Sequence, residues 1–240
     1  MRAIILAAGR GSRMQHLTND KPKCLLEVNG KRLLEHQFEA ITKAGIRSVA
    51  IVTGYKQELI KLPGVELIHN ERWAETNMVS SLVCADNLLQ EDTCIISYSD
   101  IFYDSSAISS LMENQSELAI TYDPNWAGLW EKRFQNPLDD AETFQFDEKN
   151  FLTEIGGRPK TLEDIQGQYM GLLRFMPNAW KEITAIRNNL KNTIKDKMHM
   201  TELLQRVIMA KRLNIKAIPY MGNWGEVDSE DDLNVYNKLT

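Results

Sequence analysis

Apolar runs alternate with amphipathic segments along the first half of the chain, and this pattern predicts a β-α-β order. Runs of consecutive apolar residues are typical of strands buried on both faces, whereas apolar residues at helical spacing indicate helices. We expect strands at residues 2–7, 48–53, 65–69, 93–98 and 117–122. We expect helices between them at residues 32–44, 57–62, 78–89 and 105–113. The alternation favours an α/β fold with a doubly wound, mostly parallel Rossmann-like sheet.

The pattern changes after residue 123, where an aromatic and irregular stretch reaches residue 137. Two short strands at residues 142–147 and 151–155 then read as an antiparallel pair. The remaining elements are expected to be strands at 167–175 and 214–220 and helices at 179–190, 201–213 and 229–239. Thr201 and Ser229 are suitable N-caps for the last two helices.

These elements fit a single domain over residues 1–240, which is an ordinary length for one large α/β unit. We expect a donor-nucleotide half at about 1–122 and a small antiparallel acceptor-side insertion at about 123–175. The C-terminal helices and strand then occupy residues 176–240. Ligands in such folds bind outside the carboxyl ends of the strands, and Asn70 and Asp100 both follow strands at that edge.

The loop after the first strand carries the chemistry of a phosphate site. It reads Leu6-Ala7-Ala8-Gly9-Arg10-Gly11-Ser12-Arg13, and Pro22-Lys23 follows ten residues later. Gly9 and Gly11 allow backbone N–H groups to approach a polyphosphate. Arg13 supplies a planar charged fork, and Lys23 adds a mobile point charge. Glycines alone would equally fit a simple turn, but with the arginine and the Pro-Lys step they favour a nucleotide.

Two better-known phosphate motifs are excluded. The G-x-G-x-x-G fingerprint fails because Met14 stands at the third glycine. The P-loop fails at Gly30-Lys31, where Leu25 replaces the first glycine and Arg32 replaces the final Ser or Thr.

Residues 6–23 resemble instead the nucleotidyltransferase signature L-A-A-G-x-G-[ST]-R…P-K. This group makes NDP-sugars, and one branch makes CDP-activated alcohols and amino compounds. The resemblance implies Mg²⁺-dependent transfer of a nucleotidyl group, with Lys23, Arg13 and Asp100 as catalytic residues. It also implies a metal site at Asp100 and Asp228, although Asp100 alone would suit a helix cap and Asp228 a charged surface. The expected nucleotide-binding residues are Leu6, Ala7, Ala8, Gly9, Gly11, Ser12, Arg13, Lys23, Asn77 and Ser80. Asn77 also suits the N-cap of the helix at 78–89, and both roles are compatible.

The sequence identifies the acceptor substrate less directly than the nucleotide. Sugar-1-phosphate members carry Glu-Lys-Pro before the strand at 167–175, but here Glu154 lacks the adjacent lysine. Residues 76–81 and 224–229 look closer to the phosphocholine cytidylyltransferase-like branch, and residues 133–142 resemble its phosphoglutamine-type members. We expect the acceptor to contact Tyr122, Trp126, Arg133, Glu154, Tyr169 and Gly171. Tryptophans in such a stretch more often serve core or lid packing. Asp123, Asp139, Asp140 and Glu142 offer carboxylates for an ammonium group.

Amino-acid composition further limits the possible partners and the cellular location of the protein. The net charge of −5 gives no general nucleic-acid footprint. The three cysteines are odd in number and lack a C-x-x-C pair, which indicates free thiols in a reducing compartment. With neither a signal peptide nor an apolar run of membrane length, the expected location is cytoplasmic.

We therefore expect a cytidylyltransferase that joins CMP from CTP to a small phosphorylated amino compound and releases pyrophosphate. The acceptor is of the phosphoglutamine, phosphocholine or aminoethylphosphonate type, and the product serves cell-surface polysaccharide decoration. Two alternatives stay open: a sugar-1-phosphate nucleotidyltransferase using UTP, dTTP or GTP, and a non-catalytic nucleotide-binding regulator. The sequence also leaves open whether two chains pair as a homodimer.

Overall fold

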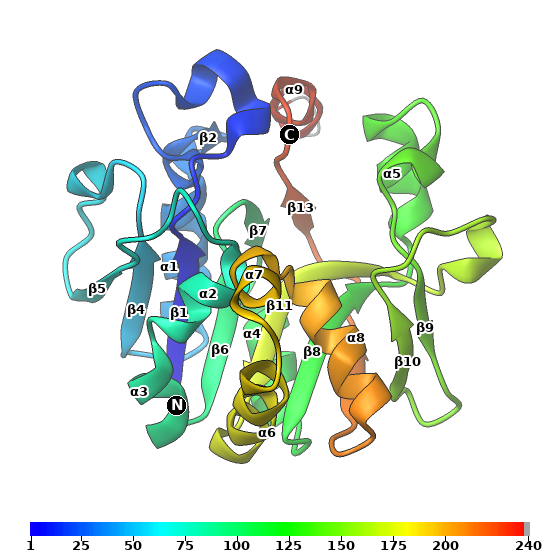
Figure 1. The fold of residues 1–240 in the computed structure, drawn as a ribbon. Helices are drawn as coiled ribbons and strands as arrows, with labels where there is room; N and C mark the ends of the chain where they lie inside the picture. Colours follow the sequence, from blue (N-terminus) through cyan, green and yellow to red (C-terminus); the bar gives the residue numbers. More distant parts are fainter. Residues whose placement is uncertain (238–240) are drawn as a thin grey trace.

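A seven-stranded sheet forms the centre of the molecule, for which the computed structural model describes residues 1–237 (Figure 1). The strand order is β12-β8-β11-β6-β1-β4-β5. β11 pairs antiparallel with both β6 and β8, whereas the other paired neighbours are parallel. The strands are β1 (Arg2–Ala7), β4 (Val49–Thr53), β5 (Val65–His69), β6 (Cys94–Tyr98), β8 (Leu118–Asp123), β11 (Gln168–Phe175) and β12 (Ile215–Pro219). The predicted doubly wound, mostly parallel α/β fold is confirmed.

Helices cover both faces of this sheet. On one face α1 (Leu33–Lys43) packs against α4 (Ser105–Glu113). On the other, α6 (Pro177–Asn188) packs against α3 (Asp86–Glu91) and α8 (Met200–Ala210). α2 (Met78–Val83) contacts α7 (Asn192–Lys197) on this second face, where α7 lies near the top of α8 (Figure 1).

The apolar runs fold as their pattern predicts. Every residue of β4 is buried, and β1 is buried from Ala3 to Ala7, as expected of strands covered on both faces. β5 has no buried residue because it lies at the edge of the sheet, where Leu67 is 47% exposed.

Short elements complete the chain. The antiparallel pair β9 (Phe144–Phe146) and β10 (Leu152–Ile155) stands beside the sheet, near α5 (Figure 1). Within the expected insertion, β11 belongs to the central sheet and separates β8 from β6. The other elements are β2 (Glu27–Val28), β3 (Lys31–Arg32), β7 (Ile101–Tyr103), α5 (Trp126–Arg133), β13 (Trp224–Glu226), α9 (Glu230–Tyr236) and the 3₁₀ helices η1 (Ser12–Thr18), η2 (Lys23–Leu25), η3 (Gln57–Leu59), η4 (Pro137–Asp139) and η5 (Leu162–Asp164).

Several local predictions differ from the structure. The helix expected at 78–89 is broken between α2 and α3, where Ala85 leaves the helical region with ψ at 22°. His199 rather than Thr201 precedes α8, so Thr201 lies in its first turn. Ser229 does cap α9, because its hydroxyl accepts a hydrogen bond from the Asp232 amide. Residues 238–239 of the expected last helix lie outside the described residues.

The aromatic stretch after residue 123 contains α5, although an irregular segment was expected. Trp126 and Trp130 are four residues apart on one face of α5, and both are buried. This spacing supplies the apolar stripe that a short helix needs for packing. Among residues 1–237, no helix has the length and apolarity required to cross a bilayer.

Candidate active site

The loop after β1 brings Lys23 close to Gly11. Gly11 has a φ of +76°, and a β-carbon added there would lie 2.7 Å from the β-carbon of Lys23. Both the backbone conformation and the close contact therefore require glycine at this position. A β-carbon added at Gly9 would have no atom within 4 Å, so a side chain there would extend into open space.

Lys23 joins two aspartates from distant parts of the chain. Its Nζ lies 2.8 Å from Oδ2 of Asp100 and 2.6 Å from Oδ1 of Asp228. Arg13 Nη2 is 3.0 Å from the same Asp228 oxygen, with its side chain 69% exposed. Burial alone would lower the pKa of Lys23, but the two carboxylates outweigh it and the pKa is raised. The structure thus assembles the four charged residues that the sequence singled out.

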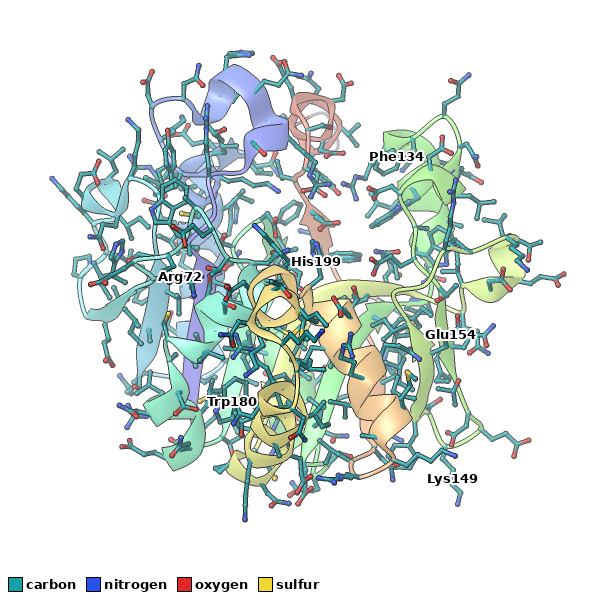
Figure 2. All side chains as sticks on the ribbon, in the orientation of Figure 1. Arg72, Phe134, Lys149, Glu154, Trp180 and His199 are labelled. Carbon is teal, nitrogen blue, oxygen red and sulfur yellow. The ribbon has the colours of Figure 1, made fainter. Side chains whose placement is uncertain are left out.

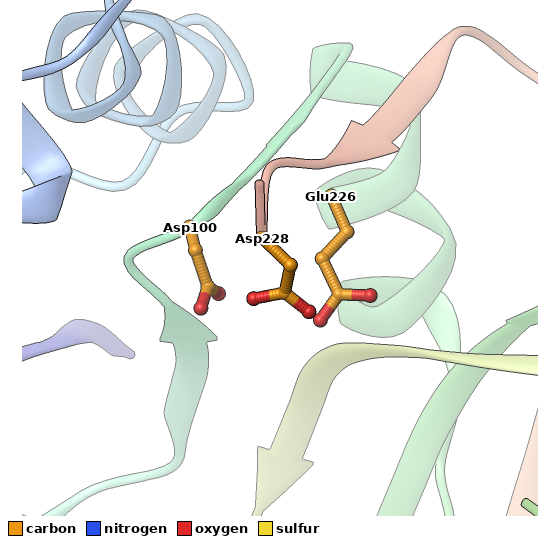
Figure 3. A group of neighbouring side chains, drawn as sticks. All are labelled: Asp100, Glu226 and Asp228. Atoms are coloured by element: carbon orange, nitrogen blue, oxygen red, sulfur yellow. The ribbon is translucent and has the colours of Figure 1, made fainter. Parts of the chain in front are cut away.

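Strand pairing adds a third carboxylate to this group. β13 pairs antiparallel with β7, and the Val227 amide donates to the Asp100 carbonyl at 2.9 Å. Asp100, Glu226 and Asp228 each offer a ligand atom, and these atoms lie within 4.8 Å of one another (Figure 3). We call these three residues the carboxylate cluster. Glu226 was not among the expected metal ligands, although its position two residues before Asp228, across a buried valine, was a usable signal.

The carboxylate cluster has the chemistry of a divalent-cation site. Burial raises the pKa of Glu226 to about 8, and the neighbouring charges of Asp228 and Asp100 add to the shift. The other Asp100 oxygen, Oδ1, is buried without a hydrogen-bond partner. Carboxylate oxygens are the ligands that Mg²⁺ prefers, and a cation would offset their repulsion. The residues present therefore fit a divalent metal ion.

A cleft runs from this cluster along the carboxyl end of β1. Its cavity volume is about 180 Å³. Its lining includes the predicted residues Leu6, Ala8, Gly9, Gly11, Arg13, Lys23, Asn77 and Asp100. Sequence reasoning did not select Trp73, Tyr98 and Ser99, which also line it. We call this the donor cleft.

Three residues expected to bind nucleotide lie beside the donor cleft without lining it. Ala7 is buried within β1, and Ser12 is exposed at the start of η1. The Ser80 hydroxyl donates to the Lys195 carbonyl and accepts from Arg187, so it faces α7 and α6.

Asn77 has both roles that its sequence position allowed. Its side-chain oxygen accepts from the Met78 amide at the start of α2, and its side chain lines the donor cleft. Its Nδ2 also donates to the Lys197 carbonyl at 3.2 Å and lies 3.0 Å from Nε2 of His199. Asn77 therefore links the donor cleft to the segment that follows α7.

A second cleft, which we call the acceptor cleft, opens on the other side of the carboxylate cluster. Arg13, Tyr98 and Asp228 lie on its walls, and Arg13 and Tyr98 also line the donor cleft. Of the residues expected at the acceptor, Tyr169 and Gly171 line it. Its other polar lining residues are Asp140, Glu142, Thr143, Gln168, His199, Thr201 and Glu226.

The other four residues expected at the acceptor lie elsewhere. Tyr122 packs against Phe144, and Trp126 packs against Trp130. The Arg133 side chain is fully buried in ion pairs. Glu154 lies on β10, apart from His199, and lines a separate groove with Gln205 and Arg206 (Figure 2). Trp126 and Trp130 pack in the core, so their aromatic signal in the sequence reflects folding of the insertion.

Comparisons with known proteins identify the family of this chain. Residues 3–149 match the family of MobA-like NTP transferase domains. The chain is 38% identical to a CTP:phosphoglutamine cytidylyltransferase of Campylobacter jejuni over 98% of both chains. It is 29% identical to a 2-aminoethylphosphonate cytidylyltransferase of Lancefieldella rimae, over 75% of this chain and 73% of the relative. The fold superposes on a CTP:phosphocholine cytidylyltransferase from Streptococcus pneumoniae with a TM-score of 0.77 and 21% identity, covering 99% and 98% of the two chains.

Proposed function

Because this chain belongs to the MobA-like NTP transferase family, we propose that it transfers CMP from CTP to a small phosphorylated amino compound. An oxygen of the acceptor phosphate attacks the α-phosphorus of CTP, and the bond to the β-phosphate oxygen breaks to release pyrophosphate. The observation that carries this proposal is the meeting of two clefts at one charged centre. The donor cleft and the acceptor cleft share Arg13, and Asp100 and Asp228 are joined there by Lys23.

The cationic side chains neutralise the charge that develops during transfer. Lys23 contacts the α-phosphate as the acceptor attacks, which requires its ammonium group to exchange a carboxylate for phosphate oxygen. Arg13 is 69% exposed at the cleft, so it is free to move onto the β- and γ-phosphates. Such preorganised charge lowers the barrier because the transferred group becomes more negative in the transition state.

The carboxylate cluster would hold Mg²⁺, with Asp100 and Asp228 as the principal ligands and Glu226 as a third. When bound there, the ion would supply positive charge to the phosphate oxygens. Asp100 Oδ1 is available for this role, since it lacks a hydrogen-bond partner.

The acceptor cleft supports an amine-bearing acceptor. Asp140 and Glu142 present carboxylates to it, and Thr201 donates a hydrogen bond to Glu142 at 3.4 Å. Tyr169 and Gly171 line this cleft and lie against Tyr98, which also lines the donor cleft. Relatives that act on phosphoglutamine and 2-aminoethylphosphonate match this chain, and both acceptors carry an amino group as well as phosphorus.

The proposal extends to the cellular compartment and to the use of the product. We place the enzyme in a reducing compartment, the cytoplasm, where Cys24, Cys84 and Cys94 remain free thiols. A CDP-activated amino compound is a suitable donor for decorating cell-surface polysaccharide. Whether the working unit is a homodimer is decided by its mass in solution.

A donor panel tests the reaction. We expect pyrophosphate release with CTP and phosphoglutamine or aminoethylphosphonate, and much slower release with UTP, dTTP, GTP or ATP. Preference for another nucleotide would overturn the cytidylyl assignment, and turnover of a sugar-1-phosphate would favour the sugar alternative. Nucleotide binding without pyrophosphate release in the presence of any acceptor of the panel would favour a regulator.

A further inference from the structure

The side chain of Arg133 connects the insertion to the carboxylate cluster. Arg133 ends α5, and the exposed fraction of its side chain is 0%. Its Nε and Nη2 donate to the two oxygens of Asp232 at 2.7 and 3.2 Å, which is a bidentate pair. Its guanidinium also lies 4.6 Å from the centre of the Trp130 ring. Stacking and a two-point hydrogen bond together fix the plane of the group.

Arg133 reaches two of the three clustered carboxylates. Directly, its Nη1 is 3.6 Å from Oε2 of Glu226. Indirectly, Asp232 Oδ2 accepts the backbone N–H groups of Asp228 and Ser229, both at 2.8 Å. The guanidinium therefore sets the position of Asp232, and Asp232 sets the backbone that carries the Asp228 side chain.

The other two cations of this centre differ from Arg133 in mobility. Arg13 is largely exposed, and Lys23 lies in the wall of the donor cleft. Both are assigned to substrate phosphates, so their charge leaves the carboxylates when nucleotide binds. Arg133 lines neither cleft and remains with the carboxylates throughout.

We propose that Arg133 is a positioning residue for the metal site, acting through Glu226 and through Asp232 on the Asp228 loop. The inference rests on the metal role proposed for the carboxylate cluster. Groups that orient the ligands of a metal ion typically change its affinity by about 10- to 100-fold when they are mutated. Arg133 thereby makes the metal site depend on correct folding of the insertion, which supplies α5.

Mn²⁺ binding to the nucleotide-free protein tests this role without any turnover. The variant Arg133→Lys keeps the positive charge but loses the bidentate fork, so a change in affinity reports geometry rather than net charge. We expect the Mn²⁺ dissociation constant, measured from free Mn²⁺ by electron paramagnetic resonance, to rise by about 10-fold. Arg174→Lys is the matched control. Arg174 is also buried, but it pairs with the Ser116 carbonyl and lies opposite Ile95, near the start of β6.

The outcomes separate this inference from the proposed function. Unchanged Mn²⁺ affinity in folded Arg133→Lys overturns it, as does an equal loss in Arg174→Lys. Should Arg133→Lys fail to fold, Asp232→Asn replaces it as the test variant. Asp232→Asn breaks the ion pair with Arg133 but keeps an oxygen for the backbone amides. This variant must also weaken Mn²⁺ binding. Absence of Mn²⁺ binding to the unmodified protein overturns the metal role and this inference together. Loss of binding in Arg133→Lys, combined with a donor other than CTP, overturns only the cytidylyl assignment.

Discussion

Lys23 lies between two carboxylates, and its charge is needed both for their neutralisation and for the α-phosphate. In Lys23→Ala we expect pyrophosphate release to fall by about 10²- to 10³-fold, the usual effect of removing one charge-stabilising donor. The fold is retained because Asp100 is 22% exposed, so water reaches the carboxylate that is left unpaired. Circular dichroism checks folding, and the matched control is Lys21→Ala, since Lys21 is exposed. Near-normal turnover in Lys23→Ala would contradict the mechanism.

Gly11→Ala and Gly9→Ala are a second pair of test and control variants. Gly11→Ala places a β-carbon 2.7 Å from Lys23 and holds alanine at a φ of +76°, which costs about 1–3 kcal/mol. We expect a lower unfolding temperature and reduced turnover, because Lys23 is displaced from the cleft. Gly9→Ala meets no atom within 4 Å, so its unfolding temperature stays near that of the unmodified protein. Equal stability of the two variants would show that the contact with Lys23 is unimportant.

The cysteines differ in reactivity. Burial raises the pKa of Cys24 to about 12, and burial raises that of Cys94 to about 12 as well. A raised pKa keeps a thiol protonated, so neither forms the reactive thiolate at pH 8. Only Cys84 is exposed. We therefore expect one maleimide per native chain by mass spectrometry, none in Cys84→Ser, and three after denaturation. Labelling of Cys24 in the native protein would contradict its burial.

The segment from α7 to the start of α8 joins the two clefts through Asn77. Asn77→Ala loses the cap of α2, which costs about 1 kcal/mol, and also the contacts to Lys197 and His199. Asn77→Asp keeps an oxygen for the cap but has no amide donor. We expect Asn77→Ala to lower the unfolding temperature and both variants to raise the KM values for CTP and acceptor. A normal KM in Asn77→Asp would show that the link to α7 is not used.

Elements that alternate regularly were predictable, and those that depend on tertiary contacts were not. The apolar runs of β1 and β4 fix their burial, because consecutive apolar residues permit no exposed face. β13 has three residues and forms because it pairs with β7, so no local sequence pattern predicts it. That pairing brings Glu226 to Asp100, which explains why sequence reasoning found two carboxylates of the cluster and missed the third. Arg133 was misplaced for a related reason: its partner Asp232 lies 99 residues away in sequence.

The donor side and the acceptor side of the site are built from different strands of the sheet. The ends of β1 and β6 supply the donor side, whereas β11 and the start of α8 supply the acceptor side. The charged centre between them draws on residues 13, 23, 100 and 228, so it forms only when the whole chain has folded. Substrate binding should consequently stabilise the entire fold rather than one part of it.

This coupling gives a prediction for thermal unfolding. CTP at about 100 times its dissociation constant should add about 2.7 kcal/mol to the free energy of unfolding, and Mg²⁺ should increase the effect at lower CTP concentrations. Because Lys23 contacts the α-phosphate in the proposed complex, Lys23→Ala should lose most of the CTP-induced rise in unfolding temperature. Lys21→Ala should retain it. Differential scanning calorimetry measures both variants in one buffer. An undiminished shift in Lys23→Ala would place the triphosphate away from Lys23 and so remove the donor cleft from the mechanism.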